Sequence, residues 1–303
     1  MEIKSFRNDV VESVHRVNYV VTREGKIIKS SGDYNELVSM RSTVKPILLK
    51  FLIPNKNGFS DKELSVMMSS HNAEPQHREV IKKIMQANNI SIKDINCGTH
   101  IPYYPDVCKQ FFTETDPSEK QLYNNCSGKH AAALIWCKNN EVHKKGYWQA
   151  THPAQIHILE SLQKEIGPDR QLKTGIDGCG FLCFHTSLLT IADLYHKIAT
   201  EDDYEHIRDA MINEPFYLGG SERVETEIST ECRLIIKCGA EGVFGAAIPG
   251  ANTAIALKVE SGNEDAADVA LVKILMELGV QNLEKWRTTN ITNCLGETVG
   301  VTQ

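Results

Sequence analysis

The chain has 303 residues, of which 41% are hydrophobic and 24% are charged, and its formal net charge is −6. This composition is typical of a soluble globular protein, and the negative charge argues against nucleic acid or an anionic membrane as the main partner. No apolar run is long enough to span a membrane, and Met1–Arg7 lacks the apolar segment of a signal peptide. Nine cysteines without disulfide-scaffold spacing favour a reducing compartment, so we expect a cytoplasmic protein.

In the first part of the chain, a β-hairpin is followed by helices. Two strand-like runs flank Gly25 and predict the hairpin, at residues 18–22 and 26–30. Capping residues, N-terminal prolines and helical spacing predict helices at residues 42–52, 60–68, from 75, 124–140, 153–166, up to 198 and 204–212. We expect residues 96–116 to be irregular and residues 175–180 to form a glycine-rich loop.

The last part of the chain returns to strands. Residues 233–237, 242–248 and 253–259 read as three strands, and a final helix is expected at 264–278. Strands at both ends with helices between them predict an α+β fold, with one antiparallel sheet built from both termini and an all-helical lobe. We therefore expect a single domain of two lobes, a sheet lobe at about 1–40 and 230–303 and a helical lobe at about 41–229.

Ser42 and Lys45 are candidates for catalysis because they lie three residues apart and would share one face of a helix. A neighbouring amine can take the proton of a serine, and burial by the apolar run after Pro46 would favour the neutral lysine. The pair also has a purely structural interpretation, in which Ser42 caps the helix and Lys45 is solvated.

Two further fragments follow in a suggestive order. Ser70-His71-Asn72 and then Lys237-Cys238-Gly239 come after the Ser-x-x-Lys pair. This echoes the order Ser-x-x-Lys, Ser-x-Asn, Lys-Thr-Gly of penicillin-recognising serine enzymes. The order favours Ser–Lys acyl chemistry.

Two cysteines suggest a metal site. Cys126 stands at a predicted helix start, where the helix N-terminus favours the thiolate, and Cys179 lies between two glycines in a loop. Two thiolates can hold a soft metal such as zinc, although the spacing is not that of a zinc finger. The alternative is that Cys126 is a small buried hydrophobic residue and Ser127 a helix cap.

Taken together, these stretches resemble the class 3 (rhizobial-type, "asparaginase II") L-asparaginases over roughly Val11 to Gly279. The blocks that carry the resemblance are Val11-Glu12-Ser13 with His15-Arg16, Arg41-Ser42 with Lys45-Pro46, Ser70-His71 with Glu74 and His77, Cys97-Gly98 with Pro102, Asn125 to His130, Ile176 to Gly180, Lys237 with Gly239 to Val243, and Ala256 to Val259. The Cys-Ser-Gly-Lys-His and Asp-Gly-Cys-Gly blocks are the most specific of these.

The resemblance implies a serine β-lactamase-like fold, a homodimer and a small-molecule amide substrate. It implies that Ser42 is the nucleophile with Lys45 as its base, and that Ser70 and Lys237 form a second Ser–Lys pair. It also implies a zinc site and a substrate pocket. Zinc, which would support binding rather than attack the amide, would be held by Cys126, Lys129 and Cys179, and the substrate by Arg41, His71, His130 and Asp177.

The sequence departs from the family next to these positions. Ile47-Leu48 replace an aromatic residue and glutamine, Asn72-Ala73 replace a small residue and glycine, and Phe181-Leu182-Cys183 stand where proline and threonine usually follow. We expect an L-asparagine amidohydrolase that releases ammonia and L-aspartate. The departures leave open a related Ser–Lys amidase or transacylase on another amide, and a non-catalytic zinc- or amino-acid-binding homologue is a further alternative. The intact serines and lysines argue against the last of these.

Overall fold

The computed structural model describes residues 1–303 and contains two compact units. The sheet unit comprises residues 1–43, 186–200 and 227–303, and the helical unit comprises residues 44–185 and 201–226. The predicted sheet lobe lacked residues 186–200, because a single helix between other helices carries no sequence signal for the unit against which it packs. No helix is both long and apolar enough to cross a membrane.

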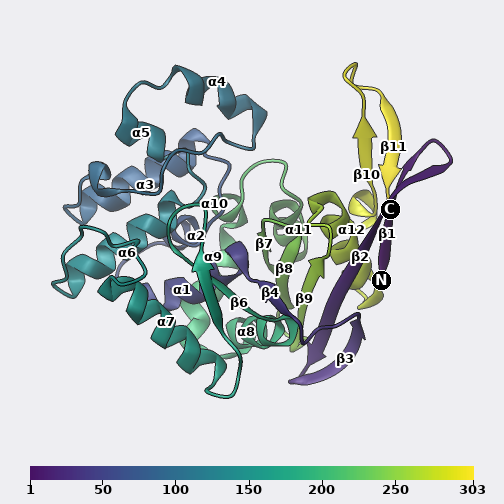
Figure 1. Cartoon of the computed structure of the whole chain (residues 1–303), viewed down its shortest axis with the longest axis horizontal. Coiled ribbons are helices and arrows are strands. Elements are labelled where there is room, and N and C mark those ends of the chain that lie inside the picture. Colours follow the sequence, from purple (N-terminus) through teal and green to yellow (C-terminus); the bar gives the residue numbers. More distant parts are fainter. The chain divides into compact units, whose positions relative to one another are not determined.

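An antiparallel sheet built from both ends of the chain organises the sheet unit. Its strands follow the order β10-β11-β1-β2-β9-β8-β7, and β3 pairs with β2. The first and last strands lie side by side, purple and yellow in Figure 1, with Ser5 opposite Thr302. The strands are β1 (Glu2–Arg7), β2 (Val10–Arg23), β3 (Lys26–Ser31), β7 (Ile235–Gly239), β8 (Val243–Ile248), β9 (Thr253–Val259), β10 (Thr289–Thr292) and β11 (Thr298–Thr302), and a short β4 (Leu37–Ser39) precedes the first helix.

Two helices cover this sheet. Consecutive residues of β8 and β9 are buried, so both faces of the sheet are covered at its centre. Helices α8 (Leu188–Thr200) and α12 (Glu264–Glu277) both pack on these strands. Gly245 of β8 permits the approach of α8, because a Cβ atom there would lie 2.1 Å from the Tyr195 ring. The hairpin turn, the three late strands and the final helix were predicted within a few residues, but β2 begins at Val10 rather than at residue 18, and β1, β10 and β11 were not predicted.

Helices dominate the other unit. They are α1 (Lys45–Leu52), α2 (Asp61–Met67), α3 (Pro75–Ala87), α4 (Pro105–Thr113), α5 (Pro117–Gln121), α6 (Ser127–Asn139), α7 (Pro153–Ile166), α9 (Glu205–Asn213) and α10 (Pro215–Leu218), with 3-10 turns η2 (Ile92–Asp94) and η3 (Asp202–Tyr204). The predicted capping box of Ser60 and Glu63 opens α2. Pro75 and Pro153 occupy the first turns of α3 and α7, and Gly167 ends α7 with φ +97°.

Helix α6 lies at the centre of this unit and contacts α1, α2, α3 and α7. Nearly all of its residues are buried, including Lys129 and His130. Gly128 allows α6 to approach α2, since a Cβ atom there would lie 1.9 Å from the carbonyl oxygen of Val66. The glycine of the Cys-Ser-Gly-Lys-His block is therefore a packing residue.

Two predictions for this unit were wrong in part. Residues 96–116 are not wholly irregular, because α4 begins at Pro105. The lobe is also not all-helical. Antiparallel strands β5 (Lys173–Ile176) and β6 (Leu182–Ser187) flank the predicted glycine-rich loop. Glycine in this segment suggested a loop, whereas the pairing of Gly175 with Cys183 makes it part of a hairpin. The chain passes between the units at four places: within the 3-10 turn η1 (Arg41–Val44), within β6, between α8 and η3, and within α11 (Val224–Cys232).

The fold class predicted from the sequence is confirmed in its main features. The sheet is antiparallel and is built from both termini, and a mostly helical insertion separates its first and last strands. The remaining 3-10 turn, η4 (Glu284–Trp286), joins α12 to β10.

Candidate active site

Ser42 lies in a turn that the sheet unit holds by hydrogen bonds. It is half-buried in η1, directly before α1. The hydroxyl of Tyr195 on α8 donates to the carbonyl oxygen of Thr43 at 2.9 Å, and the N–H and hydroxyl of Thr43 both donate to the carbonyl oxygen of Met40. Arg41 has φ +45°, a left-handed conformation that costs free energy in a non-glycine residue. The backbone around Ser42 is therefore fixed by its surroundings.

The end of strand β7 lies against this turn. A Cβ atom at Gly239 would be 3.0 Å from both the backbone nitrogen of Ser42 and the Cβ of Arg41, so a larger residue would displace the turn. Lys237, two residues earlier on β7, is completely buried and its Nζ donates to the carbonyl oxygen of Cys238 at 3.1 Å. The Lys-x-Gly spacing thus places a buried lysine on the strand that abuts Ser42.

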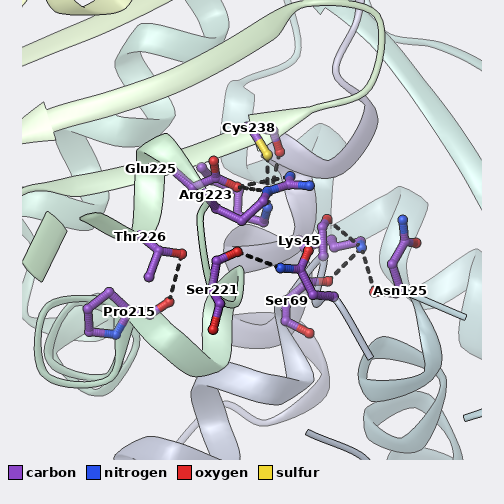
Figure 2. Close-up of polar contacts among 12 residues, drawn as sticks. Lys45, Ser69, Asn125, Pro215, Ser221, Arg223, Glu225, Thr226 and Cys238 are labelled. Carbon is purple, nitrogen blue, oxygen red and sulfur yellow. Dashed lines mark hydrogen bonds and ion pairs between the residues drawn. The ribbon is translucent and has the colours of Figure 1, made fainter. Parts of the chain in front are cut away.

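Lys45 and Ser70 meet in the helical unit. Lys45 opens α1 and is buried, and its Nζ donates to the Oγ of Ser70 at 2.9 Å. The same Nζ donates to the carbonyl oxygens of Ser69 at 2.6 Å and Asn125 at 3.4 Å, as Figure 2 shows. Buried ammonium groups need such acceptors. Lys45 therefore points to the hydroxyl of Ser70, a serine that the family resemblance pairs with Lys237.

The segment that carries Ser70 is tied to a second loop. The backbone N–H groups of Ser70 and Asn72 donate to the carbonyl oxygens of Leu218 and Gly219, at 3.0 and 2.9 Å. The side-chain amide of Asn72 donates to the carbonyl oxygen of Ser221 at 2.8 Å. Ser221 is labelled in Figure 2. These bonds hold residues 70–72 against the loop at residues 218–221.

Glu74 extends the same connection. Its carboxylate accepts from the N–H of Ser221 at 3.0 Å and from the hydroxyl of Ser221 at 2.6 Å. Between the two tied residues, Ala73 has φ +62° and is fully buried. Alanine here occupies a conformation that favours glycine. The alanine that replaces the family's usual glycine at this position therefore lies in a strained turn, directly after the Ser70 segment.

His71 is a buried, neutral histidine. The N–H of Ala73 donates to its Nδ1 at 3.0 Å, so the ring proton is on Nε2 and is donated to the Oγ of Ser127 at 3.0 Å. Burial, assisted by the nearby charges of His77 and Lys45, holds the pKa of His71 well below its usual range. Both ring nitrogens are used within the protein, so His71 positions the Ser70 segment against α6, and its role as a substrate ligand stays a prediction.

Cys126, Lys129 and Cys179 form one buried cluster. Cys126 precedes α6, Lys129 is one turn later, and the Nζ of Lys129 lies 3.2 Å from the Sγ of Cys179. A hydrogen bond from the Cys179 thiol lowers the pKa of Cys126 well below its usual range, and the shared proton raises the pKa of Cys179. Burial opposes the ammonium form of Lys129, but its electrostatic interactions with the cysteine pair and with Asp177 outweigh burial and raise the pKa of Lys129.

A tight loop presents Cys179 to this cluster. The N–H of Asp177 donates to the carbonyl oxygen of Phe181, and the N–H of Gly180 donates to the carbonyl oxygen of Asp177. Gly180 has φ +88°, and a Cβ atom there would lie 3.0 Å from the Trp148 ring. The glycine that follows the cysteine is therefore required by the turn and by close packing.

The cluster has the donor chemistry of a zinc site. Two sulfur atoms and one amine converge, and these are ligands that soft divalent metals accept. No group of three or more His, Cys, Asp or Glu side chains is placed to hold a metal ion, so a lysine nitrogen would have to complete the set. A lysine ligand must lose its proton, as must Cys179, before both can bind metal.

The predicted site residues fall in both units. Ser42, Arg41 and Lys237 belong to the sheet unit, whereas Lys45 and Ser70 belong to the helical unit. The pairs Ser42–Lys45 and Ser70–Lys237 each have one member in each unit and stay predictions. The three metal-site residues, His71, His130 and Asp177 all belong to the helical unit.

Sequence reasoning missed the residues that hold the site in place. Tyr195, Glu74 and Ser221 act through contacts between segments far apart in the chain, and only Glu74 stood in a block that had been noticed. Asn125 was noticed as part of a motif, but its carbonyl contact with Lys45 was not predicted.

Comparisons with known proteins agree with the motifs. The sequence matches the Asparaginase_II family, described as L-asparaginase II, over residues 3–303. No curated protein sequence matches the chain. Among solved structures, the chain is similar to a β-lactamase from Mycobacterium bovis, with 12% identity over 87% of this chain and 95% of that chain and a TM-score of 0.47. It is also similar to the octameric penicillin-binding protein homologue from Pyrococcus abyssi, with 12% identity over 89% of this chain and 74% of that chain and a TM-score of 0.37.

Proposed function

Because the chain belongs to the L-asparaginase II family, which confirms the resemblance found in its motifs, we propose that it hydrolyses L-asparagine to L-aspartate and ammonia. The family match supports a Ser–Lys amidohydrolase, and L-asparagine as the substrate is our proposal. The observation that carries it is the bond between the buried Lys45 and Ser70, because Lys45 opens the helix that directly follows the turn of Ser42.

The proposed reaction proceeds through an acyl-enzyme. Ser42 Oγ attacks the side-chain carbonyl carbon while a neutral lysine takes the hydroxyl proton. The C–N bond then breaks, the lysine returns the proton to the departing nitrogen, ammonia leaves, and Ser42 carries an aspartyl ester. Water adds to the ester with the same lysine as base, the C–O bond breaks, and L-aspartate leaves with Ser42 restored.

We assign the base to Lys45 and a supporting role to Ser70. Nζ of Lys45 donates to two carbonyl oxygens and one hydroxyl, and its charge also helps to lower the pKa of Cys126. Ser70 accepts from Lys45 in the ammonium form and can donate to it in the neutral form, because a hydroxyl does both. Lys237 would complete the second pair with Ser70, as the resemblance implies.

Zinc belongs to the proposal as a binding group. Cys126, Lys129 and Cys179 would hold it, and the metal would supply a weak Lewis acid that orients a polar group of the substrate. Without the metal, the contact between Lys129 and Cys179 joins the Cys179 loop to α6, and the charge of Asp177 favours the ammonium form of Lys129. We also propose a homodimer, to be tested by light scattering of the purified protein.

The residues that differ from the family's usual ones differ in how close they lie to the predicted substrate-binding residues. Ile47 and Leu48 are buried in the core. Phe181 does contact site residues, since its ring lies 4.3 Å from that of His130 and 4.4 Å from Lys129 Nζ. This observation favours, as a second candidate, an amidase of the same mechanism with a different small amide as substrate.

Ammonia release from L-asparagine, L-glutamine and small peptide amides tests the proposal. We expect asparagine to be turned over best, and Ser42→Ala to remove turnover while the protein stays folded. Ser60→Ala is the matched control, because it removes a helix-capping serine of α2 and costs only about 1 kcal/mol. Preference for another amide would establish the second candidate. A folded Ser42→Ala variant with wild-type turnover would disprove the nucleophile, and no turnover by the wild type would favour a binding protein.

A further inference from the structure

Three groups of the helical unit form a hydrogen-bonded series that ends at His130. The backbone N–H of Asn96 lies 2.9 Å from the hydroxyl oxygen of Tyr147, and this oxygen lies 2.6 Å from Nδ1 of His130. Tyr147 and His130 are both fully buried. Water is thus excluded from these contacts, and the protein groups alone decide where the protons lie.

The arrangement fixes the tautomer of His130. A backbone N–H can only donate, so Asn96 uses one lone pair of the Tyr147 oxygen. The hydroxyl proton then points to Nδ1, and the imidazole proton is on Nε2. In the opposite arrangement Nδ1 would donate to the tyrosine, and both the hydroxyl proton and the Nε2 lone pair would be buried without partners. One unpaired group costs less than two.

The Nε2–H that results has no partner within the protein. Nε2 of His130 is buried and has no hydrogen-bond acceptor among the protein groups. Buried donors in folded proteins nearly always have an acceptor, so one left without a protein partner calls for a ligand. The His130 ring packs against Phe181, over which Lys129 Nζ also lies, so this donor belongs to the same neighbourhood as the cysteine–lysine cluster.

We propose that Tyr147 is a positioning residue that holds His130 as the Nε2–H tautomer, so that Nε2–H donates to a carboxylate or carbonyl oxygen of the bound substrate. The inference rests on the proposed function, because it takes the substrate to be a small amide with such oxygens. A donor fixed in this way selects for an acceptor and against an ammonium group at the same place. Tyr147 therefore contributes to specificity without touching the substrate.

Tyr147→Phe tests the positioning role. The variant removes the hydroxyl that selects the tautomer, so nitrogen NMR of the His130 ring should change from Nε2–H alone to a mixture. In the Nδ1–H tautomer, Nε2 has no proton to donate, so the substrate oxygen that faces it is left without a hydrogen bond and binding weakens. We therefore expect KM for L-asparagine to rise about tenfold, with kcat changed less than threefold. Tyr204→Phe is the control, since Tyr204 is equally buried but its ring lies under Lys50, and we expect no change in KM.

Two substitutions of His130 separate a donor role from simple packing. The amide of glutamine can place an N–H near the position of Nε2, whereas that of asparagine reaches only the position of Nδ1. His130→Gln should therefore retain a KM within about threefold of the wild type, and His130→Asn should raise KM about tenfold or more. An asparagine variant that binds as well as the glutamine variant would overturn the proposal, as would an Nδ1–H tautomer in the wild type.

The NMR measurements keep this inference distinct from the proposed function. The tautomer is read in the ligand-free protein, and L-aspartate should shift the Nε2–H resonance without any turnover. A wild type that shows this tautomer and this shift but releases no ammonia would overturn the proposed hydrolysis and leave the role of Tyr147 supported. An Nε2–H resonance unchanged by saturating L-aspartate and L-asparagine would overturn the inference.

Discussion

Two buried lysines of the helical unit, Lys45 and Lys129, have opposite surroundings. Lys45 donates to carbonyl oxygens and a hydroxyl, which are neutral acceptors, although its charge also acts on Cys126. Lys129 contacts the sulfur atom of Cys179, and its interactions with Cys179, Cys126 and Asp177 raise its pKa. We propose that the lysine with neutral acceptors exchanges a proton during the reaction, whereas the other stays charged until a metal replaces its proton. In our proposal, the same residue type serves as base at one place and as metal ligand at the other.

Replacing each lysine by methionine should separate these roles most strongly. Lys45→Met keeps the length of the side chain but removes the base, so kcat should fall by about a hundredfold to ten-thousandfold. Lys129→Met should instead raise KM about tenfold and leave kcat within a factor of about five, because it acts on binding. Steady-state ammonia release and thermal unfolding of both variants give the measurement. Equal losses of kcat in the two variants would show that the contrast between the lysines has no mechanistic meaning.

Removal of zinc tests the Lys129 side of the comparison alone. Protein treated with a chelator should bind substrate more weakly, with KM raised about tenfold and residual kcat, and added zinc should restore KM. Cys179→Ala should imitate the stripped protein and should not respond to zinc. A loss of kcat that zinc restores without any change in KM would mean that the metal takes part in the chemistry.

The predictive power of the sequence differed between these two regions for a physical reason. Cys126 and Lys129 are one helical turn apart, so their proximity follows from helix geometry and was predicted. The contact of Lys45 with Ser70 joins two segments 25 residues apart, and local spacing carries no information about it. The sequence therefore indicated the residue types of both sites but did not predict the bond between Lys45 and Ser70, and the pairing of Ser70 with Lys237 stays a prediction.

The same distinction applies to the fold. Strands β7, β8 and β9 follow one another with short turns, and their alternating or buried patterns were readable. Strands β10 and β11 are short and partly polar, and β11 is completed by pairing with β1 at the other end of the chain. Such strands depend on long-range partners more than on their own propensity.

Acid should destabilise the region around Lys45 through His71. The pKa of His71 is lowered in the folded protein, so the unfolded state binds the proton first as pH falls. Stability should therefore be constant above about pH 6.5 and should decrease below it, by up to about 1.4 kcal/mol per pH unit for this residue. Chemical denaturation of wild type and His71→Gln between pH 7 and 5 measures the slope. An unchanged slope in the variant would show that other groups cause the acid sensitivity.

The smallest expected effect concerns the turn that follows Ser70. Ala73 has φ +62°, and the strain of this conformation is roughly 1–2 kcal/mol for a residue with a Cβ atom. Ala73→Gly relieves the strain but loses a buried methyl group, worth about 0.8 kcal/mol, and adds backbone freedom to the unfolded chain. These terms nearly cancel, so the free energy of unfolding should change by less than about 1 kcal/mol.

Ala133→Gly supplies the matched comparison from the helix that carries Lys129. Ala133 is also fully buried, but it lies within α6 in an ordinary helical conformation. Glycine there loses the same methyl group and about 1 kcal/mol of helix propensity with no strain to relieve, so it should cost about 2 kcal/mol. The difference between the two variants in urea denaturation measures the strain stored beside Ser70. Equal costs would mean that the left-handed turn at Ala73 stores none, and that the Lys45 site is no more constrained than the Lys129 helix.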